Sequence, residues 1–416
     1  MLDLGLALRN LFRHKMRSLI SLGAIVFGEV ALLLSGGFID WNLYGMRSAT
    51  IYSLLGHVQI ARPRFFTEGM ADPSAFLLPD DSNLLGRIQS IPEIKMVMPR
   101  LTFAGIVSHG ETTVSFVGEG VDPEKEQEKE RLAPAGEINK FITVSRGKGL
   151  SADDPKGVIL GDGLASTLGV NLGDKIVLLV TTSSGGVNAV EANVRGLFFT
   201  LSKAYNDVAL RAPIQLSQDL LRTKGSHVWM VFVDKTENTD RVVSELQRAA
   251  PPGKAGLEFK PWYQLADFYN KTARLYTSQM AVLYGIIGLI VVLSIANIMT
   301  MNVLERTGEI GTLMAMGIRR SKIMLSFVHE GMALGLVGGL VGIGLGCILG
   351  RVISSVGIPM PPAPGMSHGF VAEIMIGNQL ALTSLMATFV SVVVASLYPA
   401  WKASRLNIVD ALRHNR

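Results

Sequence analysis

Three ionisable side chains lie inside long apolar segments of this sequence, where charge is costly. Glu29 lies near the middle of the first apolar segment, and His329 and Glu330 lie near the start of the third. Carboxyl and imidazole groups that follow one another through a membrane can relay protons. The second and fourth apolar segments contain no acidic, basic or histidine residue, so the pattern does not predict a relay. We expect structural pairing instead or, for His329 and Glu330, side chains that reach toward the membrane surface.

Motifs that support catalysis are absent from the sequence. Residues 145–149 (SRGKG) come nearest to a phosphate-binding loop, but they lack the spacing of G-x-x-x-x-G-K-[ST]. No H-E-x-x-H metal motif or G-x-S-x-G elbow is present, and Cys347 is the only cysteine. We therefore expect a non-enzymatic chain that binds no metal or cofactor and depends on a partner for energy.

A polar segment at residues 305–322 (ERTGEIGTLMAMGIRRSK) separates two apolar segments. Four of its residues follow the i, i+3, i+4, i+7 spacing of one helix face, and we call them the docking stripe: Ile310, Leu313, Met314 and Gly317. A hairpin between two spans needs only a few polar residues, so the length and spacing predict a short amphipathic helix that docks onto a partner. The alternative is an interfacial helix that only anchors the loop. The expected contact residues are Glu305, Arg306, Glu309, Ile310, Leu313, Met314, Gly317, Arg319 and Arg320.

Four apolar segments are long enough to span a bilayer: residues 19–39, 280–304, 327–350 and 379–398. Basic residues gather near both ends of the chain and in 305–322, whereas Arg351 is the only one in 351–378. The positive-inside rule then places both ends and 305–322 in the cytoplasm, and the large segment 41–275 outside. That segment has equal numbers of basic and acidic residues. The net charge of +5 therefore indicates membrane topology and not nucleic-acid binding.

The expected fold is a membrane α-helical protein with four transmembrane helices. A large α+β extracytoplasmic domain is inserted between the first and second helices. We expect a cytoplasmic amphipathic helix at 1–18, the first span with a stalk extension at 19–40, the outer domain at 41–275, and three spans with a basic tail at 276–416. A cleaved signal peptide is the alternative for the start, but its apolar run exceeds the usual 7–15 residues.

The second span is expected to continue outside the membrane as a stalk. No proline interrupts residues 262–358, and a single helix over 263–304 would reach about 63 Å, roughly twice the hydrocarbon thickness. The first span could extend similarly to about Leu54, with Gly36 and Gly37 as its weak point. Glycines at i, i+4 in the third span favour close helix packing within the bundle or, alternatively, at a subunit interface.

The outer domain is expected to alternate short helices and strands, and its length suits two lobes. It has no cysteine, so its stability must come from its core. We interpret the charge run 122–130 (DPEKEQEKE) as a solvated helix or loop. The apolar, proline-rich loop 358–366 is interpreted as a stiff connector or as part of a lipid entry.

The whole arrangement resembles the permease subunits of MacB-type ABC transporters, whose last three spans form an FtsX-like region. Residues 302–323 (NVLERTGEIGTLMAMGIRRSKI) are similar to that family's coupling segment, ERTREIGxLRALGAxRRxI, with Gly308, Met314 and Ser321 in place of arginines. The tail at 398–413 (YPAWKASRLNIVDALR) and residues 6–18 (LALRNLFRHKMRS) fit as well. Residues 158–176 (VILGDGLASTLGVNLGDKI) are like the family's periplasmic core.

The resemblance implies a permease of the bacterial inner membrane that pairs with a second copy or a paralogue and binds a cytoplasmic ABC ATPase dimer. ATP and Mg would be bound by that partner. Residues 55–60 (LGHVQI) look more like the lipoprotein-releasing LolC and LolE branch, which implies an acylated substrate on the periplasmic side. The alternatives are drug or peptide efflux of the MacB kind and FtsX-like signalling to cell-wall hydrolases. An ion-coupled transporter would need more spans and more intramembrane charges.

Overall fold

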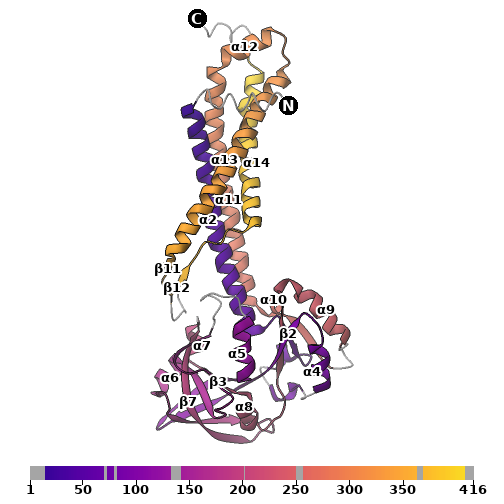
Figure 1. Cartoon of the computed structure of the whole chain (residues 1–416), viewed down its shortest axis with the longest axis vertical. Coiled ribbons are helices and arrows are strands. Elements are labelled where there is room, and N and C mark those ends of the chain that lie inside the picture. The colour runs from indigo at the N-terminus through magenta and orange to yellow at the C-terminus, as the bar shows by residue number, and fades with distance from the viewer. Residues whose placement is uncertain are drawn as a thin grey trace. The chain divides into compact units, whose positions relative to one another are not determined.

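The computed structural model describes residues 15–69, 73–78, 82–132, 142–200, 202–249, 256–362 and 369–407 (Figure 1). The predicted helix at 1–18 lies largely outside these residues, as do parts of the 358–366 loop and the basic tail. The chain forms two compact units. The helical unit comprises Met1–Leu43, Thr272–Ile358 and Val371–Arg416, and the sheet unit comprises Tyr44–Lys271 and Pro359–Phe370.

Four long helices build the helical unit, and each is long and apolar enough to cross a membrane. They are α2 (Lys15–Ala49), α11 (Asp267–Glu305), α13 (Arg320–Val356) and α14 (Asn378–Ser404) (Figure 1). The four predicted spans are therefore present as helices. Every helix extends beyond its apolar segment because the flanking polar residues continue the same backbone hydrogen-bond pattern.

Glycines of α13 allow two neighbouring helices to approach its backbone closely. A Cβ atom on Gly338 would lie 2.7 Å from Ile25 of α2, and one on Gly339 would lie 2.4 Å from Leu385 of α14. Both distances are too short for a real side chain. The predicted packing role within the bundle is confirmed for these two glycines.

The first span extends as predicted, because α2 passes through Gly36 and Gly37 without interruption and continues into a π-helical segment, Thr50–Leu55. The predicted length of the second span needs a correction. The second span is not a single helix from residue 263. A short helix α10 (Trp262–Leu265) ends at Ala266, whose backbone is not helical, and α11 begins at Asp267.

Strands of the sheet unit close into a ring of six. Strand β2 pairs with β3, and the pairing continues through β8, β5, β7 and β6 back to β2. The ring is mostly antiparallel, with parallel pairs at β3–β8 and β5–β7. The strands are β2 (Ile94–His109), β3 (Thr112–Val121), β5 (Gly157–Gly161), β6 (Lys175–Thr181), β7 (Val187–Thr200) and β8 (Ala209–Pro213). A cluster of buried apolar side chains such as Val107, Leu160 and Leu178 forms the core of this lobe.

A second lobe shares strand β2 with the ring. The sheet order β10-β1-β9-β2 is fully antiparallel, and helices α4 and α9 complete a β-α-β-β-α-β arrangement into which the ring is inserted. The elements are β1 (Val58–Ala61), α4 (Ser82–Gln89), β9 (Val228–Val233), α9 (Thr239–Ala249) and β10 (Glu258–Pro261). This lobe has its own core around Ile60, Trp229 and Leu246.

Shorter elements complete the fold. They are α3 (Phe65–Glu68), α5 (Pro123–Leu132), β4 (Ile142–Gly147), α6 (Asp162–Leu168), α7 (Lys203–Asn206), α8 (Ile214–Leu221), β11 (Ile358–Met360) and β12 (Phe370–Ala372), with 3-10 turns at Pro73–Phe76 and Thr236–Asn238. The α+β character and the two lobes predicted for this segment are therefore found in the structure.

The two chain segments that enter and leave the sheet unit pack into one hydrophobic cluster, which we call the root cluster. Tyr52 of the π-helical segment and Trp262 of α10 both belong to it, together with Met98 of β2 and Phe232 of β9. The backbone N–H of Trp262 also donates to the carbonyl of His57, which follows the π-helical segment. Both connections are thus anchored on the same part of the sheet.

Candidate coupling site

The polar segment between α11 and α13 forms a helix that is shorter than predicted. Helix α12 covers Thr307–Ala315, whereas the expected helix spanned 305–322. Arg306 leaves the helical conformation with φ −93° and ψ 11°, which separates α11 from α12. The Thr307 hydroxyl donates to the carbonyls of Val303 and Leu304 at 3.0 and 2.7 Å, so it satisfies acceptors at the end of α11.

Gly317 lies at the turn that ends α12 and does not continue its helical spacing. Its φ of +86° is favourable only for glycine, and its N–H donates to the Met314 carbonyl. The next N–H, of Ile318, donates to the Leu313 carbonyl. These two bonds form a Schellman motif, in which the glycine occupies the first position after the cap. Gly317 therefore does not continue the helical face of Ile310, Leu313 and Met314, and its contact with a partner stays a prediction.

Two members of the predicted stripe face the chain's own bundle. Ile310 and Met314 are 3% and 7% exposed. They pack in a cluster with Val303, Ile323, Phe327, Ala400 and Ala403, which come from α11, α13 and α14. Their side chains therefore hold α12 against three long helices and are covered by the chain itself.

Arg306 connects α12 to the third long helix. Its Nε donates to Glu309 at 3.2 Å, and its Nη1 donates to Glu330 of α13 at 3.4 Å. The guanidinium also lies 5.6 Å from the centre of the Phe327 ring, within cation–π range. Glu330 is 7% exposed, so its carboxylate is largely shielded from water, whereas Arg306 is partly exposed. The structural pairing predicted for Glu330 is found here, and His329 bonds through Nδ1 to the carbonyl of Leu325 in its own helix.

The side of this segment that faces away from the long helices is exposed, and we call it the coupling surface. Its apolar part consists of Leu313, Met316 and Ile318, which are 37%, 67% and 37% exposed. The side chains of Arg319 and Arg320 are exposed beside it. Glu305 and Glu309 are exposed as well, at the start of the segment. Apolar side chains next to charged ones suit a protein partner with an apolar groove and a charged rim.

Sequence reasoning missed Met316, Ile318 and Glu330 in this site. If the helical spacing continued through Gly317, Met316 and Ile318 would lie off the apolar face, so the sequence pattern left them out. The glycine itself is the signal for a helix end, and its αL turn brings Ile318 back beside Leu313. Glu330 is separated from Arg306 by 24 residues, so no local pattern reveals their pairing.

The sheet unit contains a second set of charges, which we call the buried charge cluster. Arg211 of β8 is 2% exposed and donates to Glu119 of β3 at 3.3 Å and to Glu126 of α5 at 2.7 Å. Lys129 of α5 donates to Glu126 as well, at 2.5 Å. Arg100 of β2 pairs with Glu119 at 3.6 Å. The interpretation of 122–130 as a solvated segment is wrong for the face of α5 that carries Glu126 and Lys129.

Charge pairing controls the protonation of this cluster. Burial alone would raise the pKa of Glu126, but Arg211 and Lys129 outweigh it and hold that pKa well below its usual value. The pKa of Glu119 is likewise raised by burial but lowered on balance by Arg100 and Arg211. Both carboxylates therefore stay ionised at neutral pH. The cluster also reaches the π-helical segment, because Arg100 Nη1 donates to the Leu54 carbonyl at 3.0 Å.

Comparison with known protein families matches two parts of the chain. A family described as MacB-like periplasmic core domain matches residues 18–249, which is more than half of the chain. A family described as FtsX-like permease C-terminal matches residues 281–408 and so includes the coupling surface. The chain belongs to the MacB-type ABC transporter permeases.

Relatives of this permease come from several branches of the family. It is 28% identical to the lipoprotein-releasing system transmembrane protein LolC of Haemophilus influenzae over 275 residues, which are 62% of this chain and 64% of LolC. It is 25% identical to an uncharacterized ABC transporter permease of Methanocaldococcus jannaschii, over 65% of each chain. It is 33% identical to the macrolide export ATP-binding/permease protein MacB of Syntrophobacter fumaroxidans, over 42% of this chain and 22% of that protein. The matches thus span less than two thirds of each relative's length.

Proposed function

We propose that this permease transmits the nucleotide-driven motion of a separate cytoplasmic ABC ATPase dimer to its sheet unit, and that this motion releases lipoproteins from the inner membrane. The permease would pair with a second copy or a paralogue. ATP and Mg would be bound by the ATPase, and the chain itself would be a non-catalytic subunit. The coupling surface is the observation that carries the proposal.

The coupling surface suits force transmission because its support is rigid. Helix α12 is held on the bundle by Ile310 and Met314, and the Arg306–Glu330 pair joins it to α13. A push on Leu313 or Met316 therefore moves packed helices and not a loose loop. Motion would pass to the sheet unit through α2 and α11, which are helices and not flexible linkers. The segments that follow α2 and precede α11 are both anchored in the root cluster.

Charge distribution supports the proposed orientation. Basic residues gather in 305–322 and near both ends of the sequence, while 41–275 has no net charge. By the positive-inside rule the coupling surface faces the cytoplasm, and the sheet unit faces the periplasm. An ATPase and an acylated substrate could then be engaged on opposite sides of the membrane.

Two substrate classes compete within this proposal. The match to LolC extends over 62% of the chain, which favours lipoproteins. Efflux is the second candidate, because the match to MacB reaches 33% identity over its shorter length. Substrates of the two classes differ in a measurable way. A lipoprotein leaves the membrane only to an acyl-binding acceptor, whereas an effluxed drug or peptide requires a membrane-fusion partner. FtsX-like signalling to cell-wall hydrolases would require neither.

The test is co-purification of the ATPase with exposed-surface variants of the full chain. We expect Leu313→Asp and Met316→Asp to lose the ATPase, because a carboxylate placed in an apolar groove is not compensated. The matched control is Leu172→Asp, an apolar side chain that is 45% exposed in the sheet unit. Equal ATPase recovery from all three variants would contradict docking at the coupling surface.

Mass spectrometry of the same wild-type preparation separates the substrate classes. Acylated proteins together with the ATPase would support lipoprotein release. A membrane-fusion protein would favour efflux, and a cell-wall hydrolase would favour signalling. Absence of any ATPase would contradict the coupling role itself.

A further inference from the structure

Glu29 is a fully buried carboxyl group at a point where three helices of the helical unit meet. It lies on α2 and is 0% exposed. The hydroxyl oxygens of Thr388 and Ser384, both on α14, lie 2.5 and 2.7 Å from its two oxygens. On the α13 side, a Cβ atom on Gly342 would lie 2.6 Å from the Glu29 Cβ. The glycine therefore makes the space that the glutamate occupies.

The hydrogen bonds of this group come from hydroxyls alone. Within the described part of the chain, neither bond comes from a lysine or an arginine. An ionised carboxylate without a cation is very costly in an apolar interior. A carboxylic acid fits the same positions at lower cost. Its O–H can donate to Ser384, whose own hydroxyl lies 3.1 Å from the Ala381 carbonyl, and its second oxygen accepts from Thr388.

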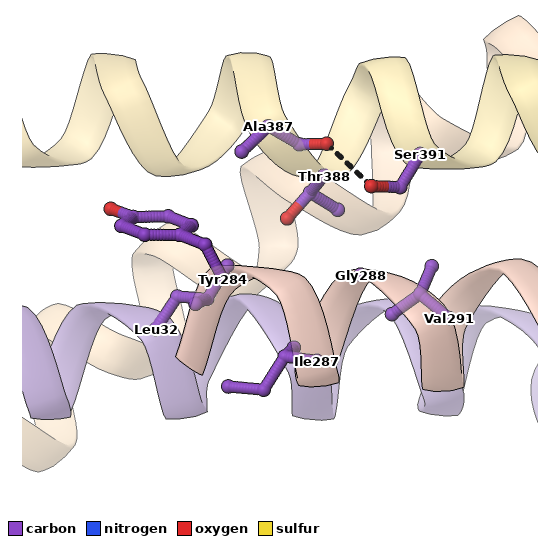
Figure 2. A pocket seen from close by; sticks show the side chains of 8 residues that line it. All are labelled: Leu32, Tyr284, Ile287, Gly288, Val291, Ala387, Thr388 and Ser391. Carbon is purple, nitrogen blue, oxygen red and sulfur yellow. Dashed lines mark hydrogen bonds between the residues drawn. The ribbon is translucent and has the colours of Figure 1, made fainter. Parts of the chain in front are cut away.

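A small pocket lies next to this group. It is lined by Leu32 of α2, by residues of α11 and by residues of α14 (Figure 2). Thr388 is shared, because it lines the pocket and also bonds to Glu29. Tyr284 of α11 is the titratable side chain in the lining. Glu29 is therefore packed closely on the Gly342 side, and the pocket lies on the Thr388 side.

We propose that Glu29 is a positioning residue that acts as a neutral acid and clips α2 to α14 through Ser384 and Thr388. The clip sets the relative position of the two helices and opens when they slide past each other during the transport cycle. Its consequence for transport rests on the proposed function, whereas its chemistry can be tested on the permease alone.

Infrared spectroscopy of the intact permease in nanodiscs at pH 7, compared between the wild type and its variants, tests the protonation state of Glu29. We expect a carboxylic C=O stretching band that disappears in Glu29→Gln and persists in Glu373→Gln, a matched change at an exposed glutamate. Persistence of the band in Glu29→Gln, or absence of the band in the wild type, would overturn the neutral acid.

A double-mutant cycle tests the clip. We expect Thr388→Val to lower Tm measurably in the wild-type background and to have no effect in a Glu29→Leu background, because its partner is then absent. Equal shifts in both backgrounds would overturn the pairing. This outcome does not depend on any ATPase.

Coupling measurements distinguish positioning from simple stabilisation. With the ATPase bound, we expect Glu29→Gln to keep the wild-type ratio of substrate released to ATP hydrolysed, since an amide can donate and accept in the same places. Glu29→Leu should lower that ratio at least several-fold while ATPase recovery is unchanged. An unchanged ratio in Glu29→Leu would overturn the role in transport, and loss of ATPase binding in the wild type would instead contradict the proposed function.

Discussion

The two units of this permease bury charge in different ways. In the sheet unit, Arg211 lies between Glu119 and Glu126, so opposite charges compensate each other. In the helical unit, the hydrogen-bond partners of Glu29 among the described residues are the hydroxyls of Ser384 and Thr388. A soluble domain can assemble ions from distant strands because they are solvated before folding. A membrane helix has already left water when its neighbours pack, so a neutral acid with hydroxyl partners is the less costly solution.

This difference predicts which side chains can be removed. Loss of one member of a compensated network leaves an uncompensated charge in the interior. Loss of Glu29 leaves only hydroxyls, which can bond to carbonyls of their own helix, as Ser384 already does at 3.1 Å from Ala381. The same truncation should therefore be damaging in one unit and mild in the other.

The largest effect is expected for Arg211→Leu. It removes the guanidinium shared by Glu119 and Glu126, which keep Arg100 and Lys129 as their respective partners, and should destabilise the sheet unit by about 3–5 kcal/mol. The loss of stability is measured by denaturant unfolding of the full permease in nanodiscs, with hydrogen exchange of the sheet-unit amides as the readout. Lys203→Ala is the control, because its pair with Asp207 is exposed and should contribute under about 0.5 kcal/mol. A similar loss in both variants would contradict the importance of burial.

A smaller effect per side chain is expected from acid. His57 accepts the Val233 N–H at Nδ1, and His227 accepts the Thr102 N–H in the same way. Burial lowers both pKa values from 6.5 to about 4. The unfolded chain binds these protons first, so stability is complete above pH 6.5 and declines as the pH falls toward 4, by up to about 3 kcal/mol per histidine.

Unfolding of the sheet unit across this pH range checks the prediction. His227→Asn should reduce the decline, because the asparagine oxygen accepts the same N–H and does not titrate there. Glu119 and Glu126 have lowered pKa values, so their contribution is present above about pH 4.5 and is lost only in stronger acid. A decline that begins below pH 4 would contradict neutral buried histidines.

An intermediate case joins the two modes of burial. The Arg306–Glu330 pair is ionic, but Arg306 is 26% exposed and solvent screens it in part. Glu330→Gln should therefore cost roughly 1 kcal/mol and should speed amide exchange in α12 specifically. Exchange at α6, a helix of the sheet unit, serves as the internal reference. Unchanged protection of α12 would mean that Ile310 and Met314 alone hold this helix.

A small stability effect is likewise expected for Glu29→Leu. The apolar side chain fills the space beside Gly342, and the two hydroxyls turn to their own helix, so the cost should be under about 1.5 kcal/mol. Thermal unfolding of the permease in nanodiscs measures it against Arg211→Leu. A larger loss for Glu29→Leu than for Arg211→Leu would reverse the comparison between the units.

The sequence predicted those parts of the fold that depend on local pattern. Four apolar segments correspond to four long helices, and the expected mixture of short helices and strands is found in the sheet unit. Local signals failed where the partner is distant. The α5 charge run appeared solvated because Arg211 is 85 residues from Glu126, and the partners of Glu29 are more than 350 residues away.

The candidate site shows the same limit on a smaller scale. Arg306, Leu313 and the basic pair after Gly317 were predicted as site residues from sequence, and their contact with a partner stays a prediction. The division of the stripe into a bundle-facing and an exposed side could not be predicted, because it depends on where α13 and α14 pack against Ile310 and Met314. The Schellman turn at Gly317 could have been predicted, since a glycine after a helical period is a local signal.

The central claim is that motion passes from an ATPase through the helices to the sheet unit. The most direct measurement is ATP hydrolysis and lipoprotein release, recorded together from the permease reconstituted with its ATPase in nanodiscs. Tyr276→Pro should interrupt α11 and remove a backbone hydrogen bond. The account predicts ATP-dependent release by the wild type, and continued hydrolysis without release by Tyr276→Pro. Equal release per ATP by both proteins would contradict transmission through this helix.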